Sequence, residues 1–308
     1  MTEVKNSWVI TVIGRTGIED ALGPVAAILK KHGLGVNGIE PLSGAQGGSG
    51  YACAEFHAVG VVREEPSMRA ELSAFADEIA VDVAVQRASE YRQERRLFVF
   101  DMDSTLIQGE TIDELAKMAG VADRVVAITA SAMRGEIEFQ ESFRRRVALL
   151  SGLPEAKALE VIERLPLMEG AERLFRTLKA RGAKTAILSG GFTFFGMVLK
   201  ERLGADYVFA NELDVRDGFV TGEVRGRIVD GARKAELLVE IAGREGIPLE
   251  QVVAVGDGAN DLPMLGLAGM GVAFHAKPVV RASARFSMKH VGLDGLLYLL
   301  GVPDWEWV

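Results

Sequence analysis

The chain has 308 residues, of which 48% are hydrophobic and 25% charged, and its formal net charge is −8. Length and composition predict about two domains of ordinary size with an ample core. The acidic balance, with no Lys/Arg run longer than residues 144–146, argues against a nucleic-acid-binding protein. No apolar stretch reaches the roughly 18 residues that cross a bilayer, and residues 1–10 lack the pattern of a signal peptide, so we expect no membrane partner.

The first 90 residues form a self-contained pattern of four expected strands and two expected helices. Apolar alternation predicts the strands at 7–14, 34–42, 51–61 and 81–89. Helical periodicity predicts the helices at 17–33 and 66–80, with Gly33 at the end of the first and Pro66 near the start of the second. The order βαββαβ predicts a ferredoxin-like domain.

This N-terminal module, residues 1–90, resembles the ACT domain, a regulatory unit that often binds amino acids. The segment GRTGI at 14–18 lies where that family has its first strand-to-helix turn. The resemblance implies that serine or another amino acid acts as an effector at this module, and that the chain pairs into a homodimer. The charged segment YRQERR, residues 91–96, is expected to link the module to a second domain at 97–308.

Cysteine and histidine usage points to packing more than to chemistry. The single cysteine, Cys53, excludes an intrachain disulfide framework and favours a reducing cytosol, so we expect a cytoplasmic protein. Cys53 lies in the alternating stretch YACAEFHAV, and we interpret it as a strand side chain, not a nucleophile. The histidines share no metal-ligand spacing, and we interpret them as structural: His32, His57, His275 and His290.

After residue 96, expected strands alternate with helical stretches. The strands are expected within 96–101, 183–191, 206–213, 251–257 and 269–274. This alternation predicts an α/β fold, a doubly wound parallel sheet with helices on both faces. In such folds the site lies at the carboxyl ends of the strands. Asp101, Ser189 and Asp257 each stand at the end of an apolar run, so we expect them to converge.

Two aspartates, Asp101 and Asp103, follow the buried strand FVF at 98–100. Like charges this close repel each other and favour a raised pKa on one of them, which folding alone does not require. Such a pair also fits a turn or a helix cap. A chemical task explains it better, because Mg²⁺ prefers oxygen ligands and an ionised carboxylate can attack phosphorus. A second aspartate two residues on can then protonate the leaving alkoxide.

Four segments in order strengthen this interpretation: DMDST at 101–105, ILSGG at 187–191, Lys234 in DGARKAELL, and GDGAND at 256–261. Over residues 95–295 the chain therefore resembles the phosphatases of the haloacid-dehalogenase superfamily, and within them those that act on phosphoserine. The second aspartate separates this group from relatives that break carbon–halogen bonds or form a stable ATPase phosphoenzyme.

The resemblance implies a role for each matching residue. Asp101 is the expected nucleophile, and Asp103 the expected general acid and base. Asp101, the backbone carbonyl of Asp103, and Asp257 are expected to hold Mg²⁺. Lys234 is expected to neutralise charge on the phosphoryl group and the nucleophile.

Further matches surround the expected phosphoryl site. The resemblance implies that Ser189 and Gly190 contact the phosphoryl oxygens through a hydroxyl and a backbone N–H. Asn260 and Asp261 match phosphate-binding and metal-supporting positions. Thr105 matches a position that orients the proton-handling aspartate.

Between Asp103 and Ser189 lie 85 residues, mostly helical in pattern. Since this is too long for a simple crossover, we expect an inserted helical cap at about 110–168 that covers the site. The resemblance implies that this cap binds the ammonium and carboxylate groups of the substrate. Glu110 is expected to pair its ammonium, and Arg146 to clamp its carboxylate with two hydrogen bonds.

Met133 and Phe139 match apolar cap positions that shape the substrate pocket. Alternatives remain for the charged residues taken alone. Glu110 also fits a carboxylate at a helix start, favoured by the helix dipole, and residues 144–146 also fit a solvated basic face.

The expected function is Mg²⁺-dependent hydrolysis of O-phospho-L-serine to L-serine and phosphate through a phospho-Asp101 intermediate, the last step of serine biosynthesis. A rival keeps the first half-reaction but passes the phosphoryl group to another alcohol, such as homoserine. A third hypothesis is a non-catalytic amino-acid sensor. The intact set Asp101, Asp103, Lys234 and Asp257 argues against the sensor.

Overall fold

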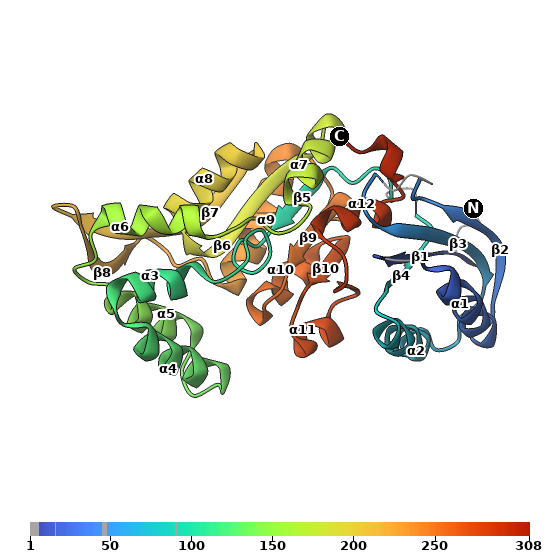
Figure 1. Ribbon diagram of the computed structural model, residues 1–308, viewed down its shortest axis with the longest axis horizontal. Helices are drawn as coiled ribbons and strands as arrows, with labels where there is room; N and C mark the ends of the chain where they lie inside the picture. Colours follow the sequence, from blue (N-terminus) through green and yellow to red (C-terminus); the bar gives the residue numbers. More distant parts are fainter. Residues whose placement is uncertain (1–5, 16, 45–47, 90–91) are drawn as a thin grey trace.

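The computed structural model describes residues 6–15, 17–44, 48–89 and 92–308. The described residues form a four-stranded sheet and a seven-stranded sheet. In Figure 1 the molecule is elongated, with the N-terminal module at one end, a group of helices at the other, and the larger sheet between them. Within the described ranges, no helix is both long enough and apolar enough to cross a membrane.

The N-terminal module has the connectivity that the sequence predicts. Its elements are β1 (Ser7–Gly14), α1 (Glu19–Lys31), β2 (Leu34–Pro41), β3 (Ala52–Gly60), α2 (Glu65–Glu78) and β4 (Asp82–Arg87). The sheet order is β2-β3-β1-β4, and every neighbouring pair is antiparallel. The expected βαββαβ order is therefore confirmed at the level of elements, with ends that shift by at most two residues.

Side chains of the inner strand β1 are buried on both faces of this small sheet, since successive side chains of a strand point to opposite faces. Trp8, Ile10 and Val12 of β1 pack with residues of the two helices. Ile13 of β1 and Cys53 of β3 instead belong to the core that continues into the rest of the chain. Cys53 is the buried strand side chain that the sequence predicts, and burial raises the pKa of its thiol.

The larger sheet has the order β11-β10-β9-β5-β6-β7-β8. Its strands are β5 (Leu97–Phe100), β6 (Lys184–Phe192), β7 (Tyr207–Arg216), β8 (Phe219–Arg225), β9 (Val252–Gly256), β10 (Met270–Phe274) and β11 (Phe286–Met288). All neighbours are parallel except β7 and β8. β5 lies at the centre, between β6 and β9, so the residue after it reaches the middle of the sheet's carboxyl edge.

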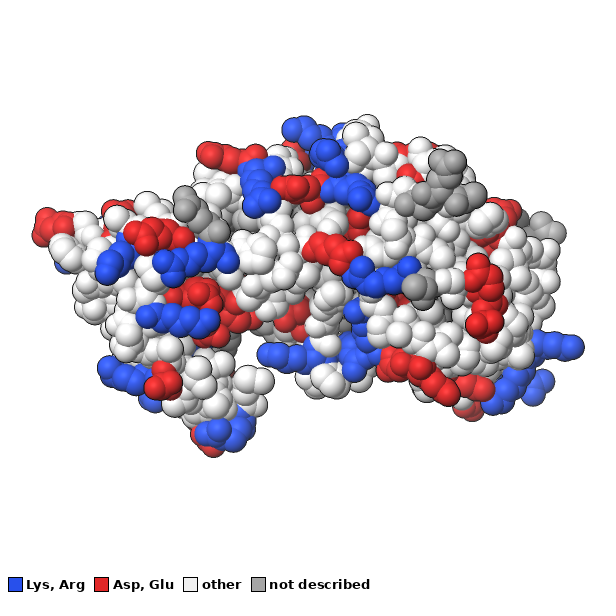
Figure 2. All heavy atoms as spheres, viewed as in Figure 1, with Lys and Arg blue, Asp and Glu red and all other residues white. Residues whose placement is uncertain are grey.

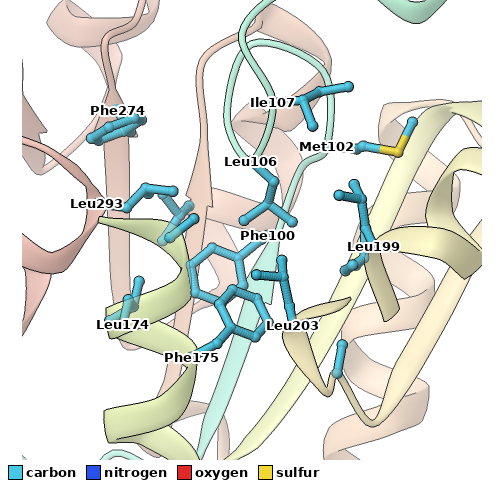
Figure 3. Packing of buried hydrophobic residues seen from close by; sticks show 14 of the residues in the cluster. Phe100, Met102, Leu106, Ile107, Leu174, Phe175, Leu199, Leu203, Phe274 and Leu293 are labelled. Atoms are coloured by element: carbon cyan, nitrogen blue, oxygen red, sulfur yellow. The ribbon is translucent and has the colours of Figure 1, made fainter. Parts of the chain in front are cut away.

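Helices cover both faces of this sheet, as expected for a doubly wound fold. One face packs against α7 (Ala171–Ala180), α8 (Thr193–Leu203) and α12 (Leu296–Leu299). The other packs against α9 (Gly231–Glu245), α10 (Leu262–Leu267) and α11 (Pro278–Ser283). β5 supplies Phe98 and Phe100 to the first core and Leu97 and Val99 to the second. Figure 3 shows Phe100 against Phe175, with ring centroids 5.0 Å apart.

The antiparallel hairpin β7–β8 was not predicted from the sequence. Its turn contains Asp217 and Gly218, with φ angles of 53° and 80°. An Asp-Gly pair in this left-handed conformation is the usual signal for a two-residue hairpin, so the signal was present. The hairpin makes the sheet mixed at this edge. The short strand β11 was also not predicted.

A helical insertion lies between β5 and β6, where the cap was expected. It contains α3 (Thr111–Ala119), α4 (Ala122–Met133), α5 (Phe139–Ala148), α6 (Glu155–Glu160) and the 3₁₀ helix η2 (Val161–Arg164). The chain returns from it beside the segment by which it leaves. The backbone N–H of Met168 donates to Leu106 O at 2.8 Å, and that of Gln108 donates to Pro166 O at 2.9 Å.

The module is fixed against the rest of the chain by buried polar contacts. Arg92, in the segment expected to be a linker, is only 8% exposed and pairs with Glu55 of β3 and with the carbonyl of Leu299. The carboxylate of Asp82 accepts hydrogen bonds from the backbone N–H groups of Lys289 and His290, at 2.8 and 2.9 Å. Position 91 of the expected linker lies outside the described residues.

Candidate active site

The residues expected to converge lie together at the carboxyl edge of the larger sheet. Asp101 follows β5, and its backbone N–H donates to Val255 O of β9 at 2.9 Å. Asp257 follows β9, and Ser189 lies in β6. Lys234, fully buried on α9, places its Nζ 2.7 Å from Asp101 Oδ1 and 2.7 Å from Asp261 Oδ1. The predicted meeting of Asp101 and Asp257 is confirmed, since their carboxylate oxygens lie within 4.8 Å of each other.

Negative charge is crowded here beyond what Lys234 neutralises. Burial raises the pKa of Asp101 well above its ordinary value, and the charge of Asp261 adds to this, while Lys234 opposes it. Burial also raises the pKa of Asp257 to about 7, with a further contribution from Asp261. Burial lowers the pKa of Lys234, but its two carboxylate neighbours outweigh that effect and raise it overall, so the ammonium stays charged.

This crowding fits a cation. Carboxylate oxygens of Asp101, Asp257 and Asp261 lie within 4.8 Å of one another. A hard divalent ion takes such oxygen ligands, and its charge would relieve the repulsion that raises their pKa values. Asp261 was expected only as a supporting residue, but the geometry brings its carboxylate into the group. The expected contribution of Asp103 through its backbone carbonyl stays a prediction.

The side chain of Asp103 is held at the start of α3. It accepts hydrogen bonds from the backbone N–H and the hydroxyl of Thr111, both at 3.1 Å. Burial and the charge of Glu110 raise the pKa of Asp103 to about 7, although the bonds from Thr111 lower it. A carboxyl group with this pKa can give and take a proton near neutral pH, as a general acid and base must.

Thr105 does not orient Asp103 in the structure, contrary to the expectation. Its hydroxyl donates to Asp257 Oδ1 at 3.4 Å. The physical reason is that Asp103 faces the first turn of α3, whereas Thr105 faces the end of β9. Thr111 is therefore the residue that holds Asp103, and sequence reasoning missed it. Its place directly after Glu110, at the start of a helix, was the only local signal.

The last residues of β6 include Ser189 and Gly190, which are expected to bind the phosphoryl group. The hydroxyl oxygen of the buried Ser189 accepts a hydrogen bond from Gly191 N at 2.8 Å. A Cβ on Gly191 would lie 2.7 Å from Asp103 Oδ2 and 2.9 Å from Thr111 Oγ1, so only glycine leaves room for the held carboxylate. A Cβ on Gly190 would lie 3.5 Å from the ring of Phe139. Sequence reasoning missed the role of Gly191.

Asn211 of β7 is a third residue that sequence reasoning missed. Its amide donates to Gly190 O at 2.9 Å, and its oxygen accepts from Val229 N at 2.8 Å. It thereby connects Gly190 to Val229, which lies just before α9. Asn260 lies in the 3₁₀ helix η4 (Ala259–Asp261). Its backbone carbonyl oxygen would lie 2.6 Å from a Cβ on Gly231, the first residue of α9.

The insertion brings three of its four expected substrate-reading residues toward the site. Phe139 stacks on Phe143, with centroids 6.3 Å apart, and covers Gly190. Burial lowers the pKa of Arg146, while the charges of Glu110, Asp113 and Asp103 act in the opposite direction. Glu110 is exposed and accepts a hydrogen bond from Ser104 Oγ at 2.9 Å.

Met133 differs from the other three. It ends α4 with a relative exposure of 67%, so its expected place in the pocket wall stays a prediction. Figure 2 shows a hollow between the insertion and the main body, with acidic atoms along its inner wall.

Comparisons with known proteins agree with this geometry. The family model of haloacid dehalogenase-like hydrolases matches residues 98–266. A phosphoserine phosphatase of Archaeoglobus fulgidus is 48% identical over 241 residues, covering 78% of this chain and 70% of that protein. A phosphoserine phosphatase of Streptomyces coelicolor is 45% identical over 297 residues, covering 96% of this chain and 71% of that protein.

Two solved structures extend the likeness. A HAD family hydrolase from Salmonella enterica serovar Typhi superposes with a TM-score of 0.85 at 33% identity, covering 96% of this chain and 98% of that one. A phosphoserine phosphatase solved as a phospho-aspartyl intermediate analogue superposes with a TM-score of 0.63 at 46% identity, covering 66% of this chain and 98% of that one. The chain belongs to the haloacid dehalogenase-like hydrolases, in their phosphoserine phosphatase branch.

Proposed function

We propose that this protein hydrolyses O-phospho-L-serine to L-serine and phosphate through a phosphoryl group carried on Asp101, with Mg²⁺ as cofactor. The observation that carries the proposal is the division of labour between two buried aspartates. Asp101 lies 2.7 Å from Lys234 Nζ, while Asp103 is held apart by Thr111 with a pKa of about 7. The likeness to named phosphoserine phosphatases supports the choice of substrate.

In the first step, a carboxylate oxygen of Asp101 forms a bond to phosphorus, and the bond from phosphorus to the serine oxygen breaks. Asp103, in its protonated form, gives its proton to that leaving oxygen. Lys234 neutralises charge that Asp101 shares with the transferring group. Ser189 and the backbone at Gly190 bind the phosphoryl oxygens.

In the second step, Asp103 acts as a base. It removes a proton from water, and the resulting hydroxide attacks the phosphorus on Asp101. The acyl phosphate bond breaks, Asp101 recovers its carboxylate, and Asp103 is again protonated. The two steps together consume one water and release serine and phosphate.

The donor set of Asp101, Asp257 and Asp261 fits Mg²⁺, which would supply positive charge against the phosphoryl oxygens. Asp257 and Asp101 are the residues that would hold it. Asp261 also accepts from Lys234 and from Gly258 N, at 2.7 and 3.0 Å, so we assign it the support of this group.

We propose that the insertion reads the amino-acid end of the substrate. Glu110 would pair with the ammonium, and Arg146 with the carboxylate in a planar fork. Phe139 would form the apolar wall above Gly190. Met133, exposed at the end of α4, would join this wall when the insertion closes on the substrate.

For the N-terminal module, we infer a ferredoxin-like, ACT-like regulatory domain that ends near residue 90. Its βαββαβ order and antiparallel sheet support the fold. The resemblance to ACT domains supports an amino-acid effector and a homodimer, and β2, an edge strand of the small sheet, offers backbone groups for pairing. A single, buried cysteine supports a cytoplasmic location.

A phosphate-release assay over a panel of phosphomonoesters tests the substrate. The proposal expects phosphoserine to be preferred over simple alkyl and aryl phosphates, and activity to require Mg²⁺. Repeating the assay with homoserine separates hydrolysis from transfer to a second alcohol. Formation of phosphohomoserine at the expense of free phosphate would replace the hydrolase by a phosphotransferase.

A further inference from the structure

One helix of the insertion, α5, packs along β8, an edge strand of the larger sheet. Both lie at the same end of the molecule in Figure 1. Gly222 of β8 makes room for this contact, because a Cβ on it would lie 3.1 Å from the backbone oxygen of Ala148, the last residue of α5. α5 carries Phe139 and Arg146, two residues that we assign to the substrate pocket. The position of this helix therefore affects substrate binding.

The chain beyond the carboxyl end of α5 is fixed to the β7–β8 hairpin by backbone hydrogen bonds. Gly152 N donates to Val220 O at 2.8 Å, and Val220 N donates to Leu153 O at 2.9 Å. Glu155 N donates to Gly218 O at 2.9 Å. Because these bonds join backbone groups, they do not depend on the identity of a side chain. This end of the helix is therefore firmly supported.

At the amino end of α5, a side chain makes the connection to the main body. Gln140, the second residue of the helix, donates from Nε2 to Asp230 Oδ2 at 2.6 Å. Burial raises the pKa of Asp230, but the hydrogen bonds from Arg233 N and Gln140 lower it below its ordinary value, so the acceptor is ionised at neutral pH. A hydrogen bond to an ionised acceptor is roughly twice as strong as one between neutral groups.

Asp230 has a second partner, in the main body. Its Oδ1 accepts from Arg233 N at 2.9 Å and thereby caps α9. α9 carries Lys234, whose Nζ lies 2.7 Å from Asp101 Oδ1. One carboxylate therefore connects the amino end of α5 to the start of the helix that supplies the active-site lysine.

We propose that the hydrogen bond from Gln140 to Asp230 holds α5 in its place over the active site. Gln140 is then a positioning residue for Phe139 and Arg146, through which it acts. Phe139 precedes it in the chain, and a Cβ on Gly190 would lie 3.5 Å from the Phe139 ring. Without the bond, α5 can pivot about its supported carboxyl end, which moves Phe139 and Arg146 relative to the phosphoryl position. The kinetic consequence rests on the proposed phosphoserine phosphatase function, whereas the position of the helix does not.

Gln140→Glu in the full chain tests the proposal, because it replaces the donor by a second carboxylate on a side chain of the same length. The lost hydrogen bond and the repulsion from Asp230 should lower kcat/KM for phosphoserine by about tenfold. The loss should appear mainly in KM, since Asp101 and Asp103 are unchanged. For an aryl phosphate, which has no ammonium or carboxylate for the insertion to bind, kcat/KM should change by less than about twofold.

Gln140→Glu combined with Asp230→Asn is the rescue variant. The amide introduced at position 230 can donate to the carboxylate at position 140, while its oxygen still accepts from Arg233 N. The kcat/KM for phosphoserine should therefore return to within about threefold of wild type. Asp230→Asn alone completes the double-mutant cycle and measures the effect of the lost charge. A purely structural defect in α5 would gain nothing from the second substitution.

Arg144→Gln is the matched control for charge. Arg144 is exposed on α5, and its loss changes the charge of that helix by one negative unit, as Gln140→Glu does. The kcat/KM for phosphoserine should stay within about twofold of wild type. Hydrogen exchange of the substrate-free protein gives a readout that needs no turnover. Amides at 139–144 should exchange faster in Gln140→Glu than in wild type, and at the wild-type rate in the rescue variant.

Three results would each overturn the proposal. The first is a Gln140→Glu protein that keeps the wild-type kcat/KM for phosphoserine, or that loses as much with the aryl phosphate. The second is a loss that the rescue variant does not recover, or that Arg144→Gln reproduces. The third is unchanged hydrogen exchange at 139–144. A wild-type protein that does not hydrolyse phosphoserine would instead contradict the proposed function, and the exchange measurement would then decide the role of Gln140 by itself.

Discussion

Two regions of the molecule bury charged side chains, and they treat them differently. At the seam between the module and the catalytic domain, most buried charges find partners inside the chain. Arg92 and Glu55 pair with side-chain exposures of 10% and 5%, and Asp82 accepts from two backbone N–H groups. At the carboxyl edge of the larger sheet, Asp101, Asp103 and Asp257 crowd around one buried lysine, and their pKa values are raised.

The difference separates charges that hold the fold from charges that act on a ligand. A buried ion is costly unless it is paired, so a fold under no chemical demand pairs it. The surplus of negative charge at the sheet edge makes sense only if a cation and a substrate enter from outside.

The largest expected effect is that of Asp101→Asn. The amide is a poor nucleophile and a weaker metal ligand, so kcat should fall by roughly 10³-fold or more. The fold should survive, because the substitution relieves like-charge repulsion. Steady-state kinetics and a melting curve on the same sample measure both effects. A variant that kept more than about a tenth of wild-type kcat, a loss under ~1.4 kcal/mol, would contradict the phospho-aspartyl mechanism.

Arg92→Ala tests the opposite region. Removing one partner of a buried pair leaves Glu55 unpaired, so the free energy of unfolding should drop by about 3–5 kcal/mol. Urea titration measures this, while kcat at a temperature where the protein is folded should stay near wild type. The control is Arg181→Ala, which removes a pair with Glu306 between exposed side chains and should cost under ~1 kcal/mol. Equal losses in the two variants would refute the distinction between the regions.

Arg146→Lys and Glu110→Gln sharpen the assignment of substrate. Lysine cannot reproduce the planar fork of a guanidinium, so kcat/KM for phosphoserine should drop by an amount on the order of 2–4 kcal/mol. Glu110→Gln should act similarly through the ammonium. Both variants should hydrolyse an aryl phosphate, which has no ammonium and no carboxylate, about as well as wild type, because Asp101 and Asp103 are unchanged. An unaltered ratio of the two kcat/KM values would remove the basis for these roles.

The smallest expected effect is the change that Asp257→Asn makes to the pH dependence of stability. The folded pKa of Asp257 is about 7, above the ordinary value of about 4. Ionisation of Asp257 therefore destabilises the metal-free folded state. The free energy of unfolding falls as the pH rises from about 4 to 7 and falls no further above that range. Asp257→Asn removes this cost, so it should stabilise the metal-free protein more at pH 8 than at pH 5, by about 1–3 kcal/mol.

Melting curves in a chelator at the two pH values measure that difference. Adding Mg²⁺ should then stabilise wild type at pH 8 much more than Asp257→Asn, since the ion takes the role of the missing positive charge. An equal response of both proteins to Mg²⁺ would exclude Asp257 from the metal site.

The sequence predicts those parts of the fold whose signals are local. The strand before Asp101 shows a short apolar run, and the segments around Ser189, Lys234 and Asp257 match a strongly specific pattern. Parallel strands then bring their ends together by geometry alone. The hairpin after β7 had an equally local signal in Asp217 and Gly218, so its omission was an error of interpretation.

Other features depend on contacts between distant segments, and no local pattern reports them. Thr111 holds Asp103 because the first turn of α3 folds back onto the residues that follow β5. Asn211 matters because β7 runs beside Gly190. The sequence suggests that Arg92 is a charged linker residue, but in the structure it is buried and pairs with Glu55, 37 positions earlier. The packing of the module on the catalytic domain could be found only from the structure.

The most direct test of the account is to follow the phosphoryl group itself. The full chain, mixed with Mg²⁺ and O-phospho-L-serine, should release serine and phosphate in equal amounts, whether or not homoserine is present. Acid quenching during turnover should yield a peptide that carries one phosphoryl group on Asp101, and Asp101→Asn should yield none. Turnover with no phosphorylated Asp101, or with the phosphoryl group recovered on homoserine, would contradict the account.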